Sequence, residues 1–204
     1  MPAINAVKRY VEGGIYHVYN RGVNRQNIFL AERDYFTFLK SFQRYLEPPA
    51  EDDLYRLIKS YHGKINLLTF SLIPNHFHTM LQQVDRCDME GFMRSLMTSY
   101  ARRINKGYER VGHLFQGPYK ARLLKGNDDL VNTSFYIHNN PEDELGANPF
   151  TYPYSSIGSY DGSGRGFVFV KERPILDLFE SAEDYINGLK DYKKVPTRSG
   201  LDLP

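Results

Sequence analysis

The spacing of apolar and polar residues along the chain predicts four strands and three long helices. Four segments rich in β-branched and aromatic residues lie between turn residues and are predicted to be strands: 14–20, 64–72, 76–83 and 118–124. Three segments carry apolar residues every three or four positions and are predicted to be amphipathic helices: 31–46, 88–106 and 128–139.

The ends of these helices follow from capping and helix-breaking residues. Asp88 is the expected N-cap of the second helix, and Gly107 its expected end. Asp128 is the expected N-cap of the third helix. That helix is expected to end at Asn140-Pro141, because proline disfavours helical backbone in the residue before it.

The order of the elements predicts the fold class. The first six follow one another as βαββαβ, which is the ferredoxin-like arrangement of a four-stranded antiparallel sheet with two helices on one face. We therefore expect a two-layer α+β fold, to which the helix at 128–139 and a C-terminal extension are added. The other face of the sheet is expected to be exposed and to carry any functional site.

Four units are expected along the chain. A single domain is predicted over 1–160, interrupted by a local insertion at 47–62. Residues 161–194 are predicted to form the C-terminal extension, with Ser181 as a helix N-cap, and residues 195–204 a disordered tail. Shorter elements are expected as follows: a helix at about 51–61, a strand at 167–170 and two helical pieces within 173–192.

Composition excludes several classes of protein. Tyr (16 residues) and Phe (13 residues) supply the aromatic core, since Trp is absent. No apolar run approaches the length of a membrane span, and the N-terminal residues lack the apolar segment of a signal peptide. The one cysteine, Cys87, excludes an intramolecular disulfide framework and a multi-cysteine zinc site. We expect a cytoplasmic protein, associated with the nucleoid if it binds DNA.

The net charge of +2 hides an uneven distribution. Residues 94–125 hold eight Lys and Arg and one acidic residue, whereas the rest of the chain holds 18 of the 26 basic residues and 23 of the 24 acidic ones. Tyr and Phe residues are interleaved with these bases, a pattern suited to phosphate contacts and base stacking. A solvated basic helix face is the alternative interpretation.

The candidate chemistry begins with His76-Phe77-His78 in the third predicted strand. Side chains two positions apart on a strand point to the same face, about 7 Å apart along the strand. Both imidazoles could therefore bind one metal ion, with Phe77 directed into the core. Taken alone, the motif is more typical of structural histidines.

Five motifs in order resemble one known family. They are YHVYNRGVNRQNIF at 16–29, LIPNHFHTML at 72–81, GHLFQGPYKARLL at 112–124, YIHNNP at 136–141 and YPYSS at 152–156. Together they resemble the REP-associated tyrosine transposases, which are relatives of the single-strand insertion-sequence transposases in the HUH endonuclease superfamily. The resemblance covers about residues 13–160, and neither the insertion nor the C-terminal extension is part of it.

The resemblance implies a metal-dependent enzyme that cuts and rejoins single-stranded DNA beside hairpins. It places the nucleophile at Tyr136, which would form a covalent 5′-phosphotyrosine. It places the metal ligands at His76, His78 and Asn140, with Mg²⁺ or Mn²⁺ as the metal. Tyr136 and Asn140 are four residues apart and share a helix face, as such a site requires. Relatives act as monomers or as homodimers, and both states stay open here.

The candidate DNA contacts come from the basic residues near this site and on the second helix. They are Arg21, Arg25, Arg94, Arg102, Arg103, Lys106, Lys120 and Arg122. For Arg21 and Arg25, which lie in a polar loop, solvation is an equally acceptable interpretation. Lys120 and Arg122 share one strand face, and we expect His76, His78, Asn140 and the Tyr136 hydroxyl to converge beside them.

Two other functions remain open at this point. The first is a hairpin-binding regulatory protein that no longer cuts, and the second is a metal-dependent nuclease without a covalent intermediate. The intact histidine pair, Tyr136 and Asn140 favour the covalent enzyme. His17 is interpreted as a packing residue rather than a functional one, and His138 is left outside the catalytic set.

Overall fold

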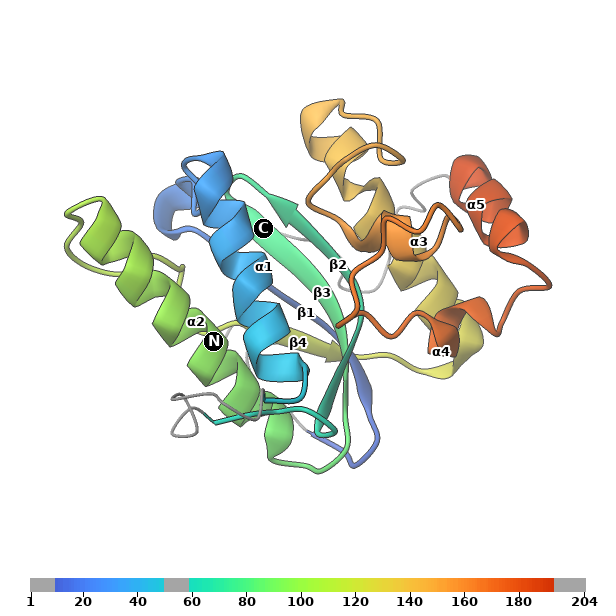
Figure 1. Ribbon diagram of the computed structural model, residues 1–204, viewed down its shortest axis with the longest axis horizontal. Helices are drawn as coiled ribbons and strands as arrows, with labels where there is room; N and C mark the ends of the chain where they lie inside the picture. Colours follow the sequence, from blue (N-terminus) through green and yellow to red (C-terminus); the bar gives the residue numbers. More distant parts are fainter. Residues whose placement is uncertain (1–9, 50–58, 193–204) are drawn as a thin grey trace.

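A four-stranded antiparallel sheet forms the centre of the computed structural model, which describes residues 10–49 and 59–192 (Figure 1). The strands are β1 (Ile15–Arg21), β2 (Ile65–Ile73), β3 (His76–Gln83) and β4 (Lys120–Leu123). They lie side by side in the order β2-β3-β1-β4, and every neighbouring pair is antiparallel. The predicted βαββαβ order and the ferredoxin-like sheet are confirmed.

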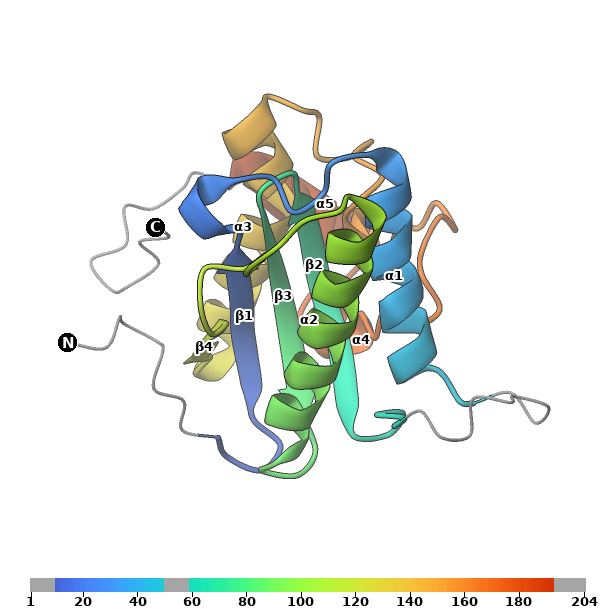
Figure 2. The same cartoon turned by 90° about the vertical axis from the view of Figure 1, so that its left-hand side faces the viewer.

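Helices α1 (Glu32–Leu46) and α2 (Asp88–Gly107) cover one face of this sheet (Figures 1 and 2). An aromatic core fills the space between them and the strands, where the ring of Phe38 lies 5.3 Å from that of Phe77 and 5.1 Å from that of Phe42. Phe77 is 0% exposed, so the residue between the two histidines points into the core as predicted.

Helix α3 (Gly126–Leu145) covers the opposite face, together with the segments that follow it (Figure 1). Its residues Thr133–His138 are all buried, and its main sheet neighbour is β2. The expectation of an exposed sheet face was therefore wrong. A face that carries buried side chains such as Met80 needs a cover, and α3 is the element that supplies it.

The observed length of α3 corrects the predicted one. The helix begins at Gly126. The carboxylate that caps its N-terminus belongs to Asp129 rather than Asp128, because the Asp129 Oδ2 atom accepts a hydrogen bond of 3.0 Å from the Lys125 N–H. It continues through Pro141 to Leu145 and ends at Gly146, whose φ of 62° is left-handed. Proline removes only one backbone donor, a cost that the packing of a well-buried helix can offset.

The start of α2 also differs slightly from the prediction. Asp88 is the first helical residue rather than the N-cap, and its carboxylate accepts a hydrogen bond of 3.1 Å from the Asp85 N–H. The helix includes Gly107, one residue beyond the predicted end at 106. Both differences lie within the normal uncertainty of a helix boundary.

The chain after α3 forms short helices. They are η2 (Ser156–Ser159), before the predicted extension, and α4 (Arg173–Leu176) and α5 (Ala182–Asp191) within it; η1 (Val23–Arg25) lies earlier in the chain. Ser181 caps α5 as predicted, since its Oγ accepts a hydrogen bond of 3.1 Å from the Asp184 N–H. The strand predicted at 167–170 is reduced to one bridge between Val170 and Leu67.

Two predicted segments fall largely outside the described residues. The helix expected at about 51–61 is described only at 59–61, where the chain is not helical, and the tail at 195–204 is not described. Across the described ranges, no helix is long and apolar enough to cross a membrane.

Candidate active site

The strand registers bring seven side chains onto the sheet face beneath α3. In β1 and β3, Tyr19 pairs with His78 and Arg21 with His76. In β1 and β4, Tyr19 pairs with Lys120 and His17 with Arg122. Because side chains alternate along a strand, the following residues share this face: His17, Tyr19, Arg21, His76, His78, Lys120 and Arg122.

His76 and Asn140 connect β3 to α3. The His76 Nε2 atom lies 3.2 Å from the Asn140 Oδ1 atom, and the His76 Nδ1 atom lies 2.6 Å from the Asn75 Oδ1 atom. Because an amide oxygen only accepts, each contact assigns a donor role to the ring nitrogen that makes it, so a cation that binds Nε2 must displace the proton that this nitrogen would donate to Asn140. Burial lowers the pKa of His76, although Glu144 and Asn140 act in the opposite direction.

His78 forms a buried pair with His17. The His17 Nε2 atom lies 2.9 Å from the His78 Nδ1 atom, and the two rings stack with centroids 5.2 Å apart. Both side chains are only 1% exposed. Burial lowers the pKa of His17 to about 3, and the positive charge of Arg122 acts in the same direction, so His17 is neutral near pH 7.

Tyr136 lies against this pair of histidines from the α3 side. Its ring centroid is 5.4 Å from that of His78 and 5.8 Å from that of His17, both in edge-on contacts. The side chain is 3% exposed. Burial raises the pKa of the Tyr136 phenol well above its usual range, and the carboxylates of Glu144 and Asp143 add to this effect. The structure thus gathers Tyr136, His76, His78 and Asn140, but buries the tyrosine.

The donor atoms at this site fit a divalent metal ion. His76 and His78 each have Nδ1 engaged by the protein, so Nε2 is the nitrogen of each ring that a cation would bind, and the Asn140 oxygen lies 3.2 Å from that of His76. The Asn140 amide is oriented with its oxygen toward His76, which leaves its buried Nδ2 atom without a hydrogen-bond partner among the described residues. A cation at this point would favour that orientation. Two imidazoles and an amide oxygen suit Mn²⁺ readily and Mg²⁺ less well.

The described residues contain no group of three or more His, Cys, Asp or Glu side chains that could hold a metal ion. The candidate centre instead combines two histidines with the amide oxygen of Asn140.

A cavity of about 260 Å³ opens beside the two histidines. His76 and His78 line it together with Arg21, Arg25 and Lys120, and Glu144 is its one acidic lining residue. Tyr136 and Asn140 lie behind this wall and do not line the cavity. A ligand that enters therefore meets cations and imidazoles before it meets the tyrosine.

The loop after β1 holds two of the cations at this cavity. A Cβ atom on Gly22 would lie 2.0 Å from the Gln26 carbonyl oxygen, so only glycine fits this turn. Asn24 and Arg25 both have left-handed backbone, with φ of 51° and 58°. The close approach explains Gly22, and asparagine is a residue that tolerates the left-handed conformation found at Asn24.

The three cations of the cavity lie close enough to affect one another. Burial lowers the pKa of Lys120, and the charge of Arg21 adds to the effect. Burial also lowers the pKa of Arg21, and the charge of Arg25 adds to that. Within residues 10–49 and 59–192, none of the three forms an ion pair with an acidic side chain. Such a group is suited to bind phosphate.

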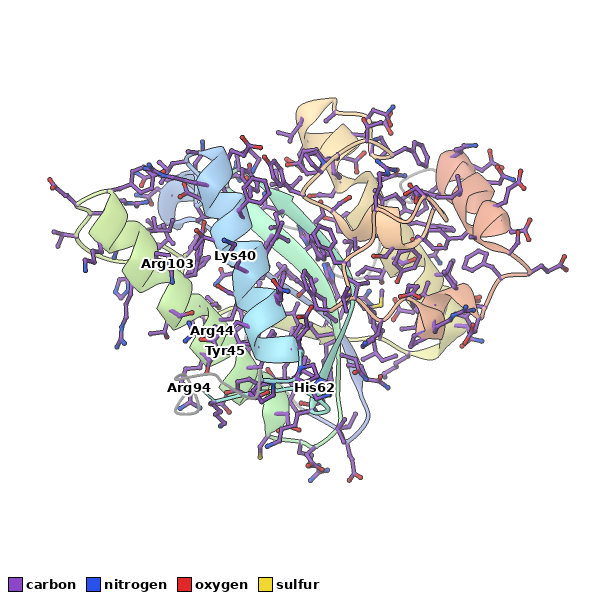
Figure 3. All side chains as sticks on the ribbon, viewed as in Figure 1. Lys40, Arg44, Tyr45, His62, Arg94 and Arg103 are labelled. Carbon is purple, nitrogen blue, oxygen red and sulfur yellow. The ribbon has the colours of Figure 1, made fainter. Side chains whose placement is uncertain are left out.

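The other predicted DNA contacts lie elsewhere. Arg94, Arg102, Arg103 and Lys106 are exposed on α2, across the sheet from Tyr136. Figure 3 shows two of them, Arg94 and Arg103, on the side of the molecule away from α3, where Lys40 and Arg44 of α1 also lie.

Arg122 faces the site but is engaged within the protein. Its guanidinium forms an ion pair of 2.9 Å with Asp129 and donates a hydrogen bond of 3.0 Å to the Thr133 Oγ1 atom. It joins β4 to α3 instead of joining the cavity cations.

His138 is a site-supporting residue that the sequence did not reveal. Its Nδ1 atom lies 2.6 Å from the Tyr185 hydroxyl, and its Nε2 atom lies 2.7 Å from the Ser156 Oγ atom. Ser156 in turn accepts a hydrogen bond of 2.8 Å from the Phe70 N–H of β2. His138 therefore holds α3 in place midway between Tyr136 and Asn140. The position of His138 within the YIHNNP motif was the only available signal.

The buried histidines predict a loss of stability in mild acid. Burial lowers the pKa values of His17 and His138 from 6.5 to about 3. Between these values the unfolded chain binds more protons, so the stability that is fully present above about pH 6.5 decreases as the pH falls toward 3. From about pH 7 to about pH 5, each histidine should reduce the free energy of unfolding by about 2 kcal/mol.

Urea denaturation at a series of pH values, with chelator present, measures this effect. A His138→Gln variant is expected to show a clearly smaller pH dependence, since one of the buried histidines with a lowered pKa is removed. A free energy of unfolding that stays constant between about pH 7 and about pH 5 would contradict this prediction. It would mean that the pKa values of both histidines are the same in the folded and unfolded protein.

A family model described as "Transposase IS200 like" matches residues 10–140. This match covers well over half of the chain and includes His76, His78, Tyr136 and Asn140. No curated protein matches the chain at a significant level.

Two solved structures are similar to this chain. A REP-associated tyrosine transposase bound to a REP hairpin has a TM-score of 0.61 at 13% sequence identity, over 81% of this chain and 89% of that chain. A protein of Deinococcus radiodurans R1, described as a candidate transposase, has a TM-score of 0.39 at 14% identity, over 68% of this chain and 97% of that chain. The first likeness shows a shared fold, whereas the second is too weak to support an argument.

The length of the family match and its span over the whole candidate site establish the relationship. The chain belongs to the IS200-like transposase family.

Proposed function

We propose that this protein is a metal-dependent endonuclease and strand transferase that acts on single-stranded DNA beside a hairpin, through a covalent 5′-phosphotyrosine at Tyr136. One observation carries the proposal: Tyr136 packs against His78 and Asn140 lies 3.2 Å from His76, and these two histidines line a cavity with three cations. Membership of the transposase family supports the reaction class, and the fold shared with a hairpin-bound relative supports the substrate.

The chemistry follows from the nucleophile. The Tyr136 oxygen would attack the scissile phosphorus, the bond from phosphorus to the 3′ oxygen would break, and the upstream strand would leave with a free 3′-OH. The phenol loses its proton as the new bond forms, and the leaving oxygen gains one. The phosphotyrosine ester preserves the energy of the broken bond, so another 3′-OH can reverse the step and join a new strand.

His76, His78 and Asn140 would hold the metal ion, Mg²⁺ or Mn²⁺. When bound, this ion would act as a Lewis acid on the scissile phosphate. The cavity cations would bind the DNA phosphates and keep the strand in line for attack. Arg21 and Lys120 would hold the scissile phosphate, and Arg25 would contact the flanking backbone.

The burial of Tyr136 constrains this reaction. At 3% exposure, the side chain cannot meet a phosphate unless the groups that cover it move. Its raised pKa keeps the phenol protonated until then. We infer that the structure represents a resting arrangement, and that substrate binding exposes the nucleophile.

The same burial favours a second candidate function, a hairpin-binding protein that does not cut. Labelled single-stranded hairpin DNA, incubated with the protein and Mg²⁺ or Mn²⁺ and run on a denaturing gel, separates the candidates. A protein–DNA adduct supports the proposed enzyme, and binding without cleavage supports the second candidate. Cleavage without any adduct would identify a hydrolytic nuclease and refute the covalent mechanism.

The cavity cations yield a specific prediction about DNA binding. In an Arg21→Ala/Lys120→Ala variant, we expect about tenfold slower cleavage at saturating DNA, because the scissile phosphate loses its anchors. The plot of log affinity against log salt should become shallower, with a slope less negative by about 1.5, as expected for two lost phosphate contacts. Single-turnover cleavage and salt titrations measure these effects.

An Arg102→Ala/Arg103→Ala variant is the matched control, since it removes the same charge from the opposite face of the sheet. If α2 binds the hairpin stem, this variant weakens binding for all sequences but leaves the rate at saturation unchanged. Slower cleavage in the α2 variant, with normal cleavage in the cavity variant, would contradict our account, because it would place the scissile strand on the α2 face of the sheet.

A further inference from the structure

We propose that His17 is a positioning residue of this site: its ring accepts a hydrogen bond from His78 and holds His78 in the one tautomer that can bind a divalent cation. This inference rests on the proposed function, because it concerns the same metal site. It assigns a role to a strand residue that the sequence alone presents as packing.

The contact between the two rings is direct and protected. The His17 Nε2 and His78 Nδ1 atoms are 2.9 Å apart, and both side chains are 1% exposed, so water cannot replace either partner. The rings are inclined by 29°, and Tyr19 also stacks on both, with centroids 4.9 Å and 5.7 Å away. The packing on the sheet face therefore fixes the orientation of both imidazoles.

The hydrogen bond determines which nitrogen of His78 can be a ligand. A neutral imidazole has one donor nitrogen and one acceptor nitrogen. Since His17 occupies Nδ1 of His78, only Nε2 is left for a cation, and it needs its lone pair for that purpose. Nδ1 of His78 must then carry the proton and donate it, and the Nε2 atom of His17 must accept.

The other metal-ligand candidate is held in the same way. The His76 Nδ1 atom lies 2.6 Å from the Asn75 Oδ1 atom, which accepts its proton, so Nε2 is the nitrogen that a cation would bind, in place of the proton that Nε2 donates to the Asn140 oxygen in the metal-free protein. His17 thus does for His78 what Asn75 does for His76. Two independent acceptors, from β1 and from the turn before β3, prepare both imidazoles for the same kind of coordination.

Packing alone does not explain an imidazole at position 17. Its Nδ1 atom is buried and has no hydrogen-bond partner among the described residues. A buried polar atom without a partner is unfavourable, and an apolar side chain of similar size would avoid that cost. Among the residues that the structure describes, the contact with His78 is the one hydrogen bond of this ring.

Two nearly isosteric substitutions test the proposal. Glutamine at position 17 can place an acceptor oxygen near the former Nε2 atom, whereas methionine fills the space without an effective acceptor. We expect His17→Gln to bind Mn²⁺ within about threefold of the wild-type affinity, and His17→Met to bind it about 10 to 100 times more weakly. Electron paramagnetic resonance titration of free Mn²⁺, without DNA, measures both affinities.

Nitrogen-15 NMR of the metal-free protein supplies a second readout. The wild type and His17→Gln should show His78 protonated at Nδ1, and His17→Met should show a mixture of tautomers or the Nε2-protonated form. Thermal denaturation identifies any variant that does not fold.

Three results would overturn the proposal. The first is wild-type affinity and an unchanged His78 tautomer in His17→Met. The second is an equal loss of affinity in both variants, which would make His17 a ligand itself. The third is a wild-type His78 protonated at Nε2. If the wild type binds no Mn²⁺, the proposed metal site fails, and the tautomer measurements still decide whether His17 orients His78.

Discussion

Replacement of Tyr136 by phenylalanine is expected to abolish the protein–DNA adduct and to slow hairpin cleavage by roughly a thousandfold or more. The substitution removes only the phenolic oxygen, and the ring keeps its edge-on contacts with His17 and His78. Folding and hairpin binding should therefore stay close to those of the wild type. Single-turnover cleavage on denaturing gels, with thermal denaturation and a binding assay beside it, measures all three quantities.

Tyr154→Phe is the matched control for this experiment. Tyr154 is a tyrosine outside the candidate site, and its ring stacks on that of Tyr35 in α1 with centroids 3.9 Å apart. Its variant should form the adduct at the wild-type rate. Cleavage that survives in Tyr136→Phe would remove the tyrosine from the mechanism, and an adduct that survives would place the nucleophile at another residue.

Replacement of His76 by alanine is expected to produce the second largest effect, a loss of cleavage of about a hundredfold or more together with a loss of Mn²⁺ binding. His76 is the better choice of the two histidines because it is partly exposed and lines the cavity. Replacement of His78 would remove the hydrogen-bond partner of the buried His17 and would therefore destabilise the fold. Cleavage rates over a range of Mg²⁺ and Mn²⁺ concentrations, with a direct Mn²⁺ titration, measure the effect.

His62→Ala serves as its control. His62 is exposed, lies near the C-terminal end of α1, and contacts the Leu46 carbonyl oxygen at 2.9 Å (Figure 3). This variant should keep the metal dependence of the wild type. An unchanged metal dependence in His76→Ala would exclude His76 as a ligand and leave the histidine motif with a structural role.

Periodicity was sufficient to predict the central fold. The segments 14–20 and 76–83, rich in aromatic and aliphatic residues between turn residues, and the apolar stripe of 88–106 correspond to β1, β3 and α2 within one or two residues. The two strands are buried on both faces and the helix along one stripe, so the apolar residues of each element are concentrated enough to carry a strong signal. The short apolar run at 167–170 carries a weak one, because a single bridge to Leu67 satisfies it.

The position of α3 could not be predicted in the same way. Local rules end a helix before Pro141, but these rules describe isolated segments. Here His138 is fixed by Tyr185, which lies 47 residues later in the chain, and by Ser156. Such tertiary contacts hold the helix across the proline and press it onto the sheet, which is why the expected exposed face is covered.

In the candidate site, too, local spacing could be predicted from the sequence, whereas contacts between elements could not. The i, i+2 and i, i+4 spacings placed His76 with His78 and Tyr136 with Asn140 correctly on their own elements. The contact of His17 with His78 depends on the register of β1 against β3, which the sequence does not contain. Charge clustering likewise gave no information on which face of the sheet α2 would cover.

The position of the covalent bond tests the central claim most directly. The adduct formed with hairpin DNA and Mn²⁺ can be trimmed with nuclease, digested with protease and analysed by fragmentation mass spectrometry. Our account predicts a nucleotide attached through its 5′ phosphate to Tyr136 and to no other tyrosine. A nucleotide attached to a different residue, or efficient cleavage with no modified peptide, would contradict it.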